Sequence, residues 1–547
     1  MSVLLVAPIG APFRWQEVEY SAPWAKVDIK SRTSIRLVYE LLSNKGIKPR
    51  VVVFALDTLS AHTRVTRGEP VEGAKCLPDP LENLDEDQLE PAKYHEFMYS
   101  VGMCISYWFS RFESINVDAV ILPGFGEHRY ITISGEARRA YWRLSRDLEK
   151  RGVEPMEYLM AFQALHLIKL MQEHFSGGKA ELHVDLTHGI NYVGYSLYRA
   201  ALFASRVYSA ASRAEVEVTI YNSEPYVAGV EKLNVWIVRR ERIRPKAAAS
   251  RLVYASLAER SREGPYEKLR VDDVIVESRE ISGRVKREVN RRLGKLRILN
   301  YSGWPAAAAV LIGAPLLLAQ AWLFAKEGGL SSEELKGYPS MLLDALPLVK
   351  VRKGLDGESK VEIEHVAALS YGHLKKLAAL AALTLYSRHA LMFKGVKVAT
   401  RASRLPCSRK EKRVVVASLK ALEDISKGML AGPSKAIVEN EIANFIRAIK
   451  DERVARDYML SAEAHKVCSR AEDLHAKRES LDGGIDRRVF AAHAGLTARA
   501  ITVESECSTD PKTSLKIYYD PCLLDRVREA AQNLMKDTAE SIFVEEP

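Results

Sequence analysis

Arg488 and His493 have side chains suited to cleaving a phosphodiester bond without a metal ion. Histidine can transfer a proton near neutral pH, and the planar guanidinium of arginine can stabilise negative charge on a phosphate through two hydrogen bonds. Such a reaction needs both kinds of group. A spacing of five residues turns the two side chains about 140° apart on a helix, so one copy of the pair makes an awkward site. Two copies facing each other across a two-fold axis could pool their side chains.

The Arg–His pattern is weak by itself. In a basic chain with 13 histidines, roughly two or three such spacings are expected by chance. One of them is Arg470 with His475. A purely structural role for Arg488 and His493 therefore stays open on these residues alone.

A second chemical feature is the turn Thr187-His188-Gly189, which follows an alternating apolar run and precedes a helical pattern over 190–204. A strand passing into a helix in this way places the turn at the carboxyl end of a sheet, where ligands bind. Free backbone N–H groups and the helix dipole there favour an anion such as a phosphate. The alternative is that Asp185 and Thr187 only cap the helix while Gly189 relieves strain.

Other polar turns follow the remaining predicted strands. Gly10 and Ala11 come after the first strand, and Ser31, Thr33 or Ser34 could cap the next helix or donate to a phosphate. Gly124 lies in a Pro-Gly-Phe-Gly turn, which alone is weak evidence for a ligand site. Because the ends of parallel strands share one edge, these turns can share one pocket.

Strand and helix patterns alternate over the first 240 residues, which predicts an α/β Rossmann-like domain with a mostly parallel sheet and helices on both faces. The predicted strands are Val3–Ala7, Arg50–Ala55, Asp118–Leu122, Leu182–Leu186, Val216–Tyr221 and Leu233–Val238, and the helices are Ser34–Leu42, Tyr94–Ser110, Met156–His174 and Ile190–Val207. Residues 57–92 form a polar, acidic insertion between these elements.

The pattern changes after residue 240. Residues 241–300 form a basic connector, for which a solvated helix is the main interpretation and RNA contact the alternative. Residues 301–547 predict an all-α domain with helices over Val366–His389, Val414–Leu430 and Ile437–Ala471. A small β-hairpin is expected from the alternating runs Ala500–Glu504 and Leu515–Tyr519.

Composition limits the class of protein. The chain has 547 residues, a net charge of +10 and six scattered cysteines without a CxxC pair. We expect a basic, soluble, cytoplasmic protein of two or three domains, with neither a metal cluster nor a disulfide framework and no signal peptide. The nearly uncharged segment 304–325 is long enough to span a membrane, but Pro305, Gly313 and Pro315 interrupt it, which favours a buried helix or helix pair.

Together these motifs resemble the CRISPR-associated type III accessory ribonucleases, which join a CARF domain to a HEPN domain. Four segments resemble CARF motifs: Val184–Tyr192, Val6–Pro12 with Trp15, Leu122–Gly124 and Tyr221–Tyr226. The stretch Arg488–Gly495 and the hairpin after it resemble the HEPN nuclease motif.

The resemblance implies a homodimeric, metal-independent endoribonuclease of single-stranded RNA that is activated by a cyclic oligoadenylate. Cyclic tetra-adenylate is the usual activator of such CARF domains, and no resident cofactor is expected. By this resemblance Arg488 and His493 are the catalytic pair. The predicted ligand residues, with Ala11 and Ser34 added from the adjoining turns, are Gly10, Ala11, Ser34, Gly124, Thr187, His188, Gly189 and Asn191.

One departure concerns Val489, because members of this family often carry asparagine directly after the catalytic arginine. Whether Arg487 assists the reaction is therefore left open. Three alternatives remain: a ring nuclease that degrades its own activator, a CARF-domain regulator, and a structural protein with an inactive HEPN site.

Overall fold

The computed structural model describes residues 2–86, 91–189, 191–226, 229–257, 269–281, 283–354, 359–403, 411–431, 436–443, 491–492, 494–496, 501–505 and 511–544. The statements below concern these residues.

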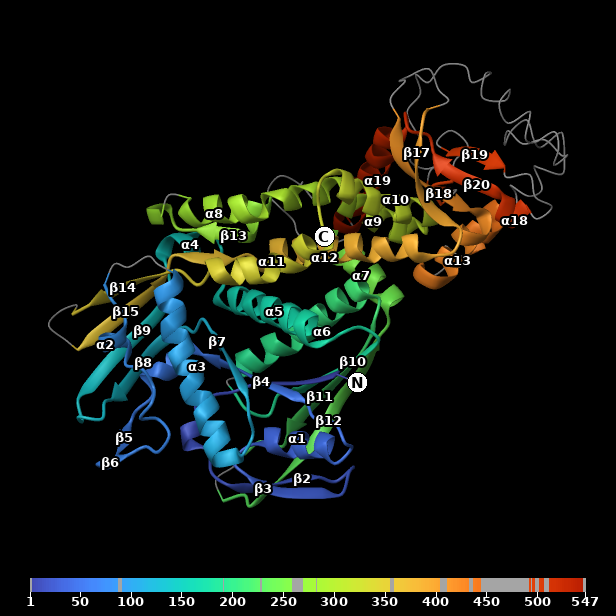
Figure 1. The fold of residues 1–547 in the computed structure, drawn as a ribbon. Helices are drawn as coiled ribbons and strands as arrows, with labels where there is room; N and C mark the ends of the chain where they lie inside the picture. The colour runs from blue at the N-terminus through green and yellow to red at the C-terminus, as the bar shows by residue number, and fades with distance from the viewer. Residues whose placement is uncertain are drawn as a thin grey trace.

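The core of the amino-terminal region is an eight-stranded, mostly parallel sheet in the order β3-β2-β12-β11-β10-β1-β4-β7 (Figure 1). Its strands are β1 Ser2–Pro8, β2 Val18–Ala22, β3 Val27–Ser31, β4 Arg50–Leu56, β7 Asp118–Leu122, β10 Lys179–Asp185, β11 Glu215–Ser223 and β12 Lys232–Ile243. The predicted strands are confirmed. Sequence patterns missed β2 and β3, which form a short antiparallel pair at one edge.

Helices cover both faces of this sheet, as predicted. Helices α5 (Pro155–His174) and α6 (Asn191–Ser212) pack on one face, and α1 (Ser34–Ser43) and α3 (Pro91–Glu113) on the other. Neighbouring residues of β1 join different cores, since Leu4 packs with α5 and α6 whereas Leu5 packs with α1 and α3. Burial on both faces explains the continuous apolar run of β1.

A second, four-stranded sheet in the order β14-β15-β9-β8 combines segments that are distant in sequence. Its strands are β8 Gly126–Ile131, β9 Ala137–Leu144, β14 Val349–Lys353 and β15 Lys360–His365. Strand β9 pairs in parallel with β15, with Ala140 opposite Val361. The carboxy-terminal half therefore completes a sheet that begins before residue 150.

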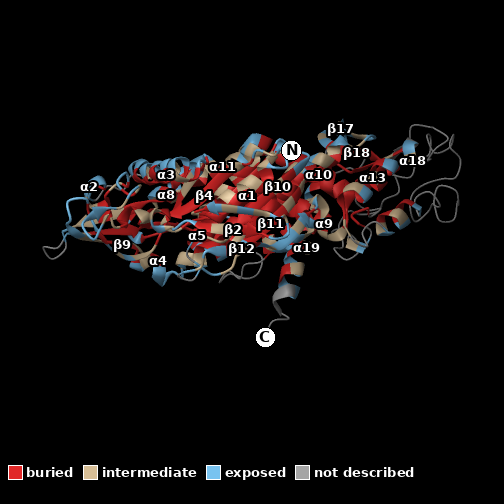
Figure 2. Cartoon of the chain, turned by 90° about the horizontal axis from the view of Figure 1, so that it is seen from below, coloured by how far each residue is buried: buried red, intermediate tan, exposed pale blue. Residues whose placement is uncertain are grey.

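The apolar segment 304–325 is a buried helix pair, as predicted. Helix α9 (Leu299–Ile312) ends at Gly313, whose φ of 73° is left-handed, and Pro315 begins α10 (Pro315–Glu327). Both helices lie among the buried residues of the interior together with α12 (Tyr371–Arg388) (Figure 2). Among the described residues, no helix has the length and apolar character needed to cross a membrane.

The carboxy-terminal half is rich in helices, as predicted, but it also contains strands that the sequence analysis did not expect. Ala367–Leu369 is strand β16, and Lys412–Ser418 is strand β18, where helices were predicted to begin. The run Val414-Val415-Val416 explains the second error, because β-branched side chains favour strands. Ser418 then caps α13 (Leu419–Met429) by accepting a hydrogen bond from the backbone N–H of Ala421. The predicted helix 437–471 lies mostly outside the described residues.

The predicted hairpin near the carboxyl end is confirmed. Strands β19 (Ile501–Ser505) and β20 (Leu515–Tyr519) pair antiparallel, with Val503 opposite Ile517. They extend a sheet in the order β17-β18-β20-β19, in which β17 spans Val396–Arg401. Helix α19 (Leu524–Val544) follows.

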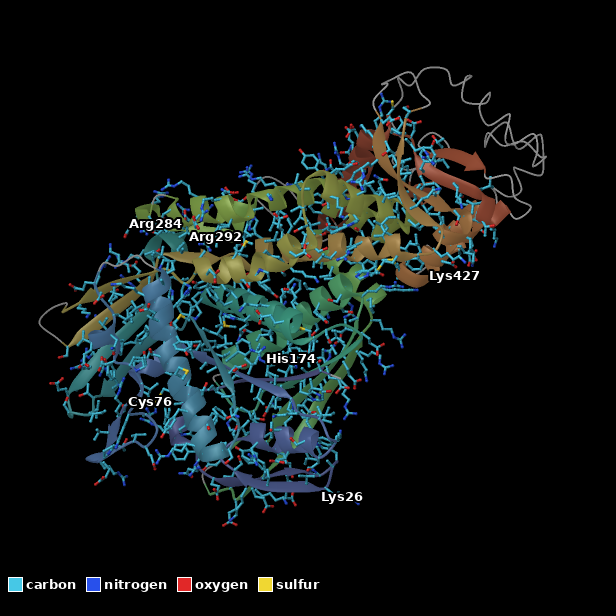
Figure 3. All side chains as sticks on the ribbon, in the orientation of Figure 1. Lys26, Cys76, His174, Arg284, Arg292 and Lys427 are labelled. Carbon is cyan, nitrogen blue, oxygen red and sulfur yellow. A yellow bond between two sulfur atoms is a disulfide. The ribbon has the colours of Figure 1, made fainter. Side chains whose placement is uncertain are left out.

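The cysteines were expected to form no disulfide framework, and the bond between Cys76 and Cys104 was not predicted. Cys76, in the insertion, is bonded to Cys104 of α3, with Cα atoms 5.4 Å apart (Figure 3). The two cysteines are 28 positions apart and belong to no paired motif, so the sequence carried no signal for this bond. It ties the insertion, which contains the β5–β6 hairpin (Val65–Thr66 and Glu69–Pro70), to the body of the sheet.

Replacing Cys76 with serine is expected to lower the free energy of unfolding by about 3 kcal/mol, because the bond closes a loop of this length in the unfolded chain. Thermal unfolding of the variant, compared with the wild type with and without reductant, measures the effect. An unchanged melting temperature in both comparisons would contradict it.

Candidate functional site

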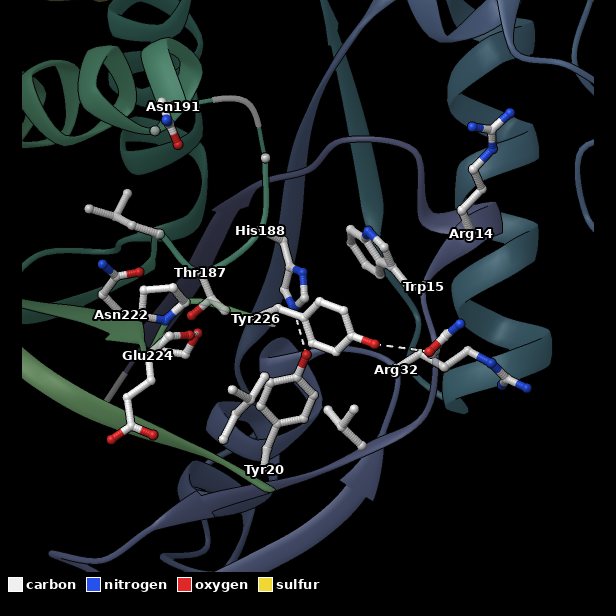
Figure 4. A pocket seen from close by; sticks show the side chains of 18 of the residues that line it. Arg14, Trp15, Tyr20, Arg32, Thr187, His188, Asn191, Asn222, Glu224 and Tyr226 are labelled. Atoms are coloured by element: carbon white, nitrogen blue, oxygen red, sulfur yellow. Dashed lines mark hydrogen bonds between the residues drawn. The ribbon is translucent and has the colours of Figure 1, made fainter. Parts of the chain in front are cut away.

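A pocket of about 840 Å³ lies at the carboxyl ends of β10 and β11, where α6 begins (Figure 4). We call it the strand-end pocket. Its lining is aromatic, polar and cationic: Arg14, Trp15, Gln16, Val18, Tyr20, Arg32, Leu186, Thr187, His188, Gly189, Asn191, Gly194, Tyr195, Asn222, Ser223, Glu224, Pro225, Tyr226, Gly229 and Leu233. Its volume falls in the range of about 300–1,000 Å³ usual for small-molecule sites.

Asp185 holds the Thr187-His188-Gly189 turn in place. Its carboxylate is fully buried and accepts hydrogen bonds from the backbone N–H of Thr187 (3.0 Å) and the hydroxyl of Ser34 (2.6 Å). Burial raises the pKa of Asp185, and both hydrogen bonds oppose that rise. Asp185 therefore shapes the turn and does not merely cap a helix.

His188 lines the pocket with an uncharged imidazole ring. Its Nε2 accepts a hydrogen bond from the backbone N–H of Ser34 (3.1 Å), the first residue of α1. That contact requires an unprotonated Nε2 and places the ring proton on Nδ1. Burial lowers the pKa of His188 to about 3. The ring lies 4.2 Å from that of Trp15, so His188 supplies shape and not positive charge.

Positive charge in the strand-end pocket comes from Arg14 and Arg32. Arg32 stacks over Phe112, 5.2 Å from the ring centre, and has Glu113 at 4.0 Å. Sequence analysis did not select either arginine. Both arginines could have been recognised from their neighbours in the sequence. Arg14 precedes Trp15, and Arg32 lies within the Ser-Arg-Thr-Ser run before α1.

Two tyrosines line the pocket and make hydrogen bonds with other lining residues. The hydroxyl of Tyr226, after β11, donates a hydrogen bond to Gln16 (2.9 Å), which links the two loops over the cavity. Tyr20 of β2 lies beneath His188, with its hydroxyl 3.3 Å from Nε2. Tyr20 was missed because β2 itself was missed.

The structure brings together half of the predicted ligand residues. Thr187, His188, Gly189 and Asn191 line the strand-end pocket. Gly10, Ala11, Ser34 and Gly124 lie outside its lining. Two of these still support it: Gly10 approaches Gly189, since a Cβ there would lie 3.9 Å from the Gly189 Cα, and Ser34 binds Asp185 and His188.

Gly124 belongs to a separate buried cluster around Asp57. Its backbone N–H donates to the Asp57 carboxylate (2.8 Å), which also accepts from the hydroxyl of Tyr94 (2.6 Å). The indole N–H of Trp142 donates to that same hydroxyl (3.1 Å). A side chain at Gly124 would collide with Thr58, whose Cγ2 lies 2.5 Å from the position of a Cβ. Gly124 therefore has a structural role in the packing of this cluster.

Asp57 makes stability depend on pH. Burial raises its pKa from 3.8 to about 7. Between these values the folded protein keeps a proton that the unfolded chain loses, so stability falls as pH rises from about 4 to about 7. The slope is at most about 1.4 kcal/mol per pH unit.

Replacing Asp57 with asparagine is expected to flatten this part of the pH profile, because asparagine keeps a neutral hydrogen-bonding group there. Melting temperatures between pH 5 and 8 measure this dependence of stability on pH. Asp118→Asn, at an exposed carboxylate of β7, is the control and is expected to keep the wild-type slope. Equal slopes in the wild type and Asp57→Asn would contradict the assignment.

The predicted catalytic residues Arg488 and His493 lie outside the described residues, as does the pair Arg470 and His475. The backbone resumes at Ala494, which is buried, and Gly495 has a left-handed φ of 73°. The hydroxyl of Tyr519 in β20 donates to the Gly495 carbonyl (3.1 Å), so this segment packs beside the hairpin.

The doubly wound sheet with a pocket at its strand ends is the architecture of a ligand-binding α/β domain. Residues 4–225 match the family model described as "CRISPR system endoribonuclease Csx1, CARF domain". The predicted likeness to CRISPR-associated ribonucleases with a CARF domain is thereby confirmed. Over 321 residues the chain is 24% identical to the CRISPR system endoribonuclease Csx1 of Methanocaldococcus jannaschii. That match covers 58% of this chain and 55% of the relative, so the chain spans just over half of the relative's length.

Proposed function

We propose that the protein is a metal-independent endoribonuclease of single-stranded RNA in type III CRISPR defence, activated by a cyclic oligoadenylate in the strand-end pocket. The activator is cyclic tetra-adenylate, and the working form is a cytoplasmic homodimer. Arg488 and His493 are the catalytic pair of a HEPN domain. The observation that carries the proposal is the strand-end pocket in a region that matches the Csx1 CARF domain.

The pocket chemistry suits an adenylate ring. Arg14 and Arg32 can pair with phosphates, and the start of α6 offers backbone N–H groups without helical partners. The exposed rings of Tyr195 and Tyr226 offer stacking surfaces for bases. Two such pockets facing across a two-fold axis would present a symmetric ring with symmetric contacts.

Helix α6 can carry the signal from the pocket to the carboxy-terminal half. It begins at Asn191 in the pocket, and its Phe203 ring contacts Tyr371 at the start of α12 (6.3 Å between centres). Near its end, the Ala211 carbonyl lies 3.2 Å from Nε2 of His389. A ligand that binds one arrangement of these helices more tightly shifts the population towards it.

The experiment uses full-length protein, labelled single-stranded RNA and EDTA, with and without cyclic tetra-adenylate. We expect cleavage that requires the activator and survives the chelator. Cleavage lost in EDTA would overturn the metal-independent mechanism, and cleavage equal without activator would overturn the regulation. Loss of cyclic tetra-adenylate itself during incubation would instead identify a ring nuclease.

A further inference from the structure

A second, strongly basic pocket lies between β12, α6 and α7 (Pro245–Leu257). We call it the arginine pocket. It encloses about 200 Å³ and is lined by Arg206, Arg239, Arg240, Glu241, Arg242, Ile243, Ala247, Ala248 and Arg251. The predicted strand ended at Val238, whereas β12 continues to Ile243. The basic run that follows Val238 is therefore part of the sheet.

The arginine pocket is distinct from the strand-end pocket. Asn191 begins α6 in the latter, and Arg206 lies about 22 Å farther along the helix at about 1.5 Å per residue. In Figure 1, β12 runs beside β11 towards α7, which places the arginine pocket at the end of the sheet nearest the carboxy-terminal helices.

Carboxylates within the arginine pocket do not balance its guanidinium groups. Glu241 is shared by Arg239 (2.5 Å), Arg251 (3.2 Å) and Arg206 (3.7 Å). Arg242 pairs instead with Glu215 (3.2 Å). Arg240 and Arg242 point to the opposite face of β12 from Glu241, because successive side chains of a strand alternate, so Glu241 faces three guanidinium groups. The pocket therefore keeps an excess of positive charge.

Arg206 shows that an acceptor is missing. Its Nε is buried and has no hydrogen-bond partner in the described part of the chain. Burial, followed by the nearby Arg251, lowers the pKa of Arg206. A buried donor without an acceptor is unfavourable, and an anion in the pocket would supply the acceptor.

The surroundings favour an extended polyanion over a small one. Arg239 of β12 and Arg251 of α7 approach Glu241 from two different elements and both side chains are about half exposed, so the cations spread across the surface between the strand and the helix. Tyr254 lies one helical turn from Arg251 on α7 and is 56% exposed. Cations beside an exposed aromatic ring are the combination that binds single-stranded nucleic acid.

We propose that the arginine pocket binds the phosphate backbone of single-stranded RNA and that Tyr254 stacks on one of its bases. This inference rests on the proposed function in taking RNA as the substrate, and it adds a contact site on the CARF side of the molecule. The pocket positions RNA and takes no part in cleavage.

The test is equilibrium binding of full-length protein to a fluorescent, 2′-O-methylated single-stranded RNA, which cannot be cleaved through its 2′-hydroxyls. Fluorescence anisotropy is measured over a range of NaCl concentrations for the wild type and for R239Q/R251Q. We expect the slope of log K against log [NaCl] to become shallower by about 1.4, since each lost phosphate contact removes about 0.7. Tyr254→Ala is expected to weaken binding without changing that slope.

The matched control is R284Q/R291Q, which removes the same charge from exposed positions on α8 (Arg284–Leu293; Arg284 is labelled in Figure 3). The control is expected to keep the wild-type slope, and melting temperatures confirm that all variants fold. Wild-type affinity and slope in R239Q/R251Q would overturn the proposal, as would an equal change in the control or no RNA binding by the wild type. If the pocket bound only small phosphates, the double variant would keep the wild-type affinity and slope for RNA.

Binding and cleavage separate the two proposals. Weaker RNA binding by R239Q/R251Q supports the arginine pocket even if cyclic tetra-adenylate activates no cleavage. Activated cleavage with normal RNA binding by R239Q/R251Q rejects the arginine pocket and leaves the proposed function intact.

Discussion

Replacing His493 with alanine is expected to reduce activator-dependent RNA cleavage by at least about a hundredfold, because general acid–base catalysis by one side chain contributes about 10²–10⁴. Arg488→Ala is expected to cause a loss of similar size, since the guanidinium stabilises charge on the phosphate. Cleavage rates of labelled single-stranded RNA at saturating cyclic tetra-adenylate measure both effects. Activator binding should stay at the wild-type level.

His475→Ala is the matched control, because Arg470 and His475 repeat the same spacing twenty or so residues earlier. We expect it to cleave RNA like the wild type. Activity that survives in His493→Ala and disappears in His475→Ala would move the site to the earlier pair. Activity lost in both variants together with activator binding would indicate damage to the fold and contradict both assignments.

Replacing Gly189 with alanine is expected to raise the activator concentration needed for half-maximal cleavage about tenfold. Gly189 has a φ of 127°, which alanine rarely adopts. A Cβ there would also lie 3.1 Å from the Cβ of Pro8. Strain of this kind costs on the order of 1–3 kcal/mol, and the turn can escape it only by moving away from the pocket geometry.

Gly178→Ala controls for the backbone strain, because Gly178 also has a positive φ (79°) but nothing lies within 4 Å of its Cβ position. This glycine lies in the loop before β10, away from the pocket lining. We expect the control to lose some thermal stability and to keep the wild-type response to activator. An equal shift of the activation curve in both variants would show that the effect is general and not local to the turn.

Sequence patterns predicted the parts of the fold that depend on neighbouring residues. The strands β1, β4, β7, β10 and β11 have apolar runs long enough to be read directly, and their mostly parallel arrangement follows from alternation with helices. The pairing of β9 with β15 depends on contacts between residues more than 200 positions apart, which no local pattern contains. The same limit explains why the bond between Cys76 and Cys104 was not foreseen.

The strand-end pocket was predicted where one turn carried several chemical signals. Thr187, His188 and Gly189 follow a strand directly, so topology alone placed them at a ligand edge. The cations came from elsewhere, since Arg14 and Arg32 lie on loops around strands that sequence patterns missed. Gly124 follows a strand at the predicted edge of the sheet. It packs against Asp57 and Thr58, however, and lies outside the pocket.

Strand β15 has a consequence for how such proteins can be divided and recombined. Because β9 lies between β8 and β15, removing the carboxy-terminal half would leave β9 as an unpaired edge, with the side chain of Trp142 no longer covered by the core that Val361 and Ile363 complete. Exposed edges of this kind invite aggregation. A chimera that exchanges the sensing half between relatives must therefore include residues 349–365. The two halves are one structural unit and cannot be exchanged as independent modules.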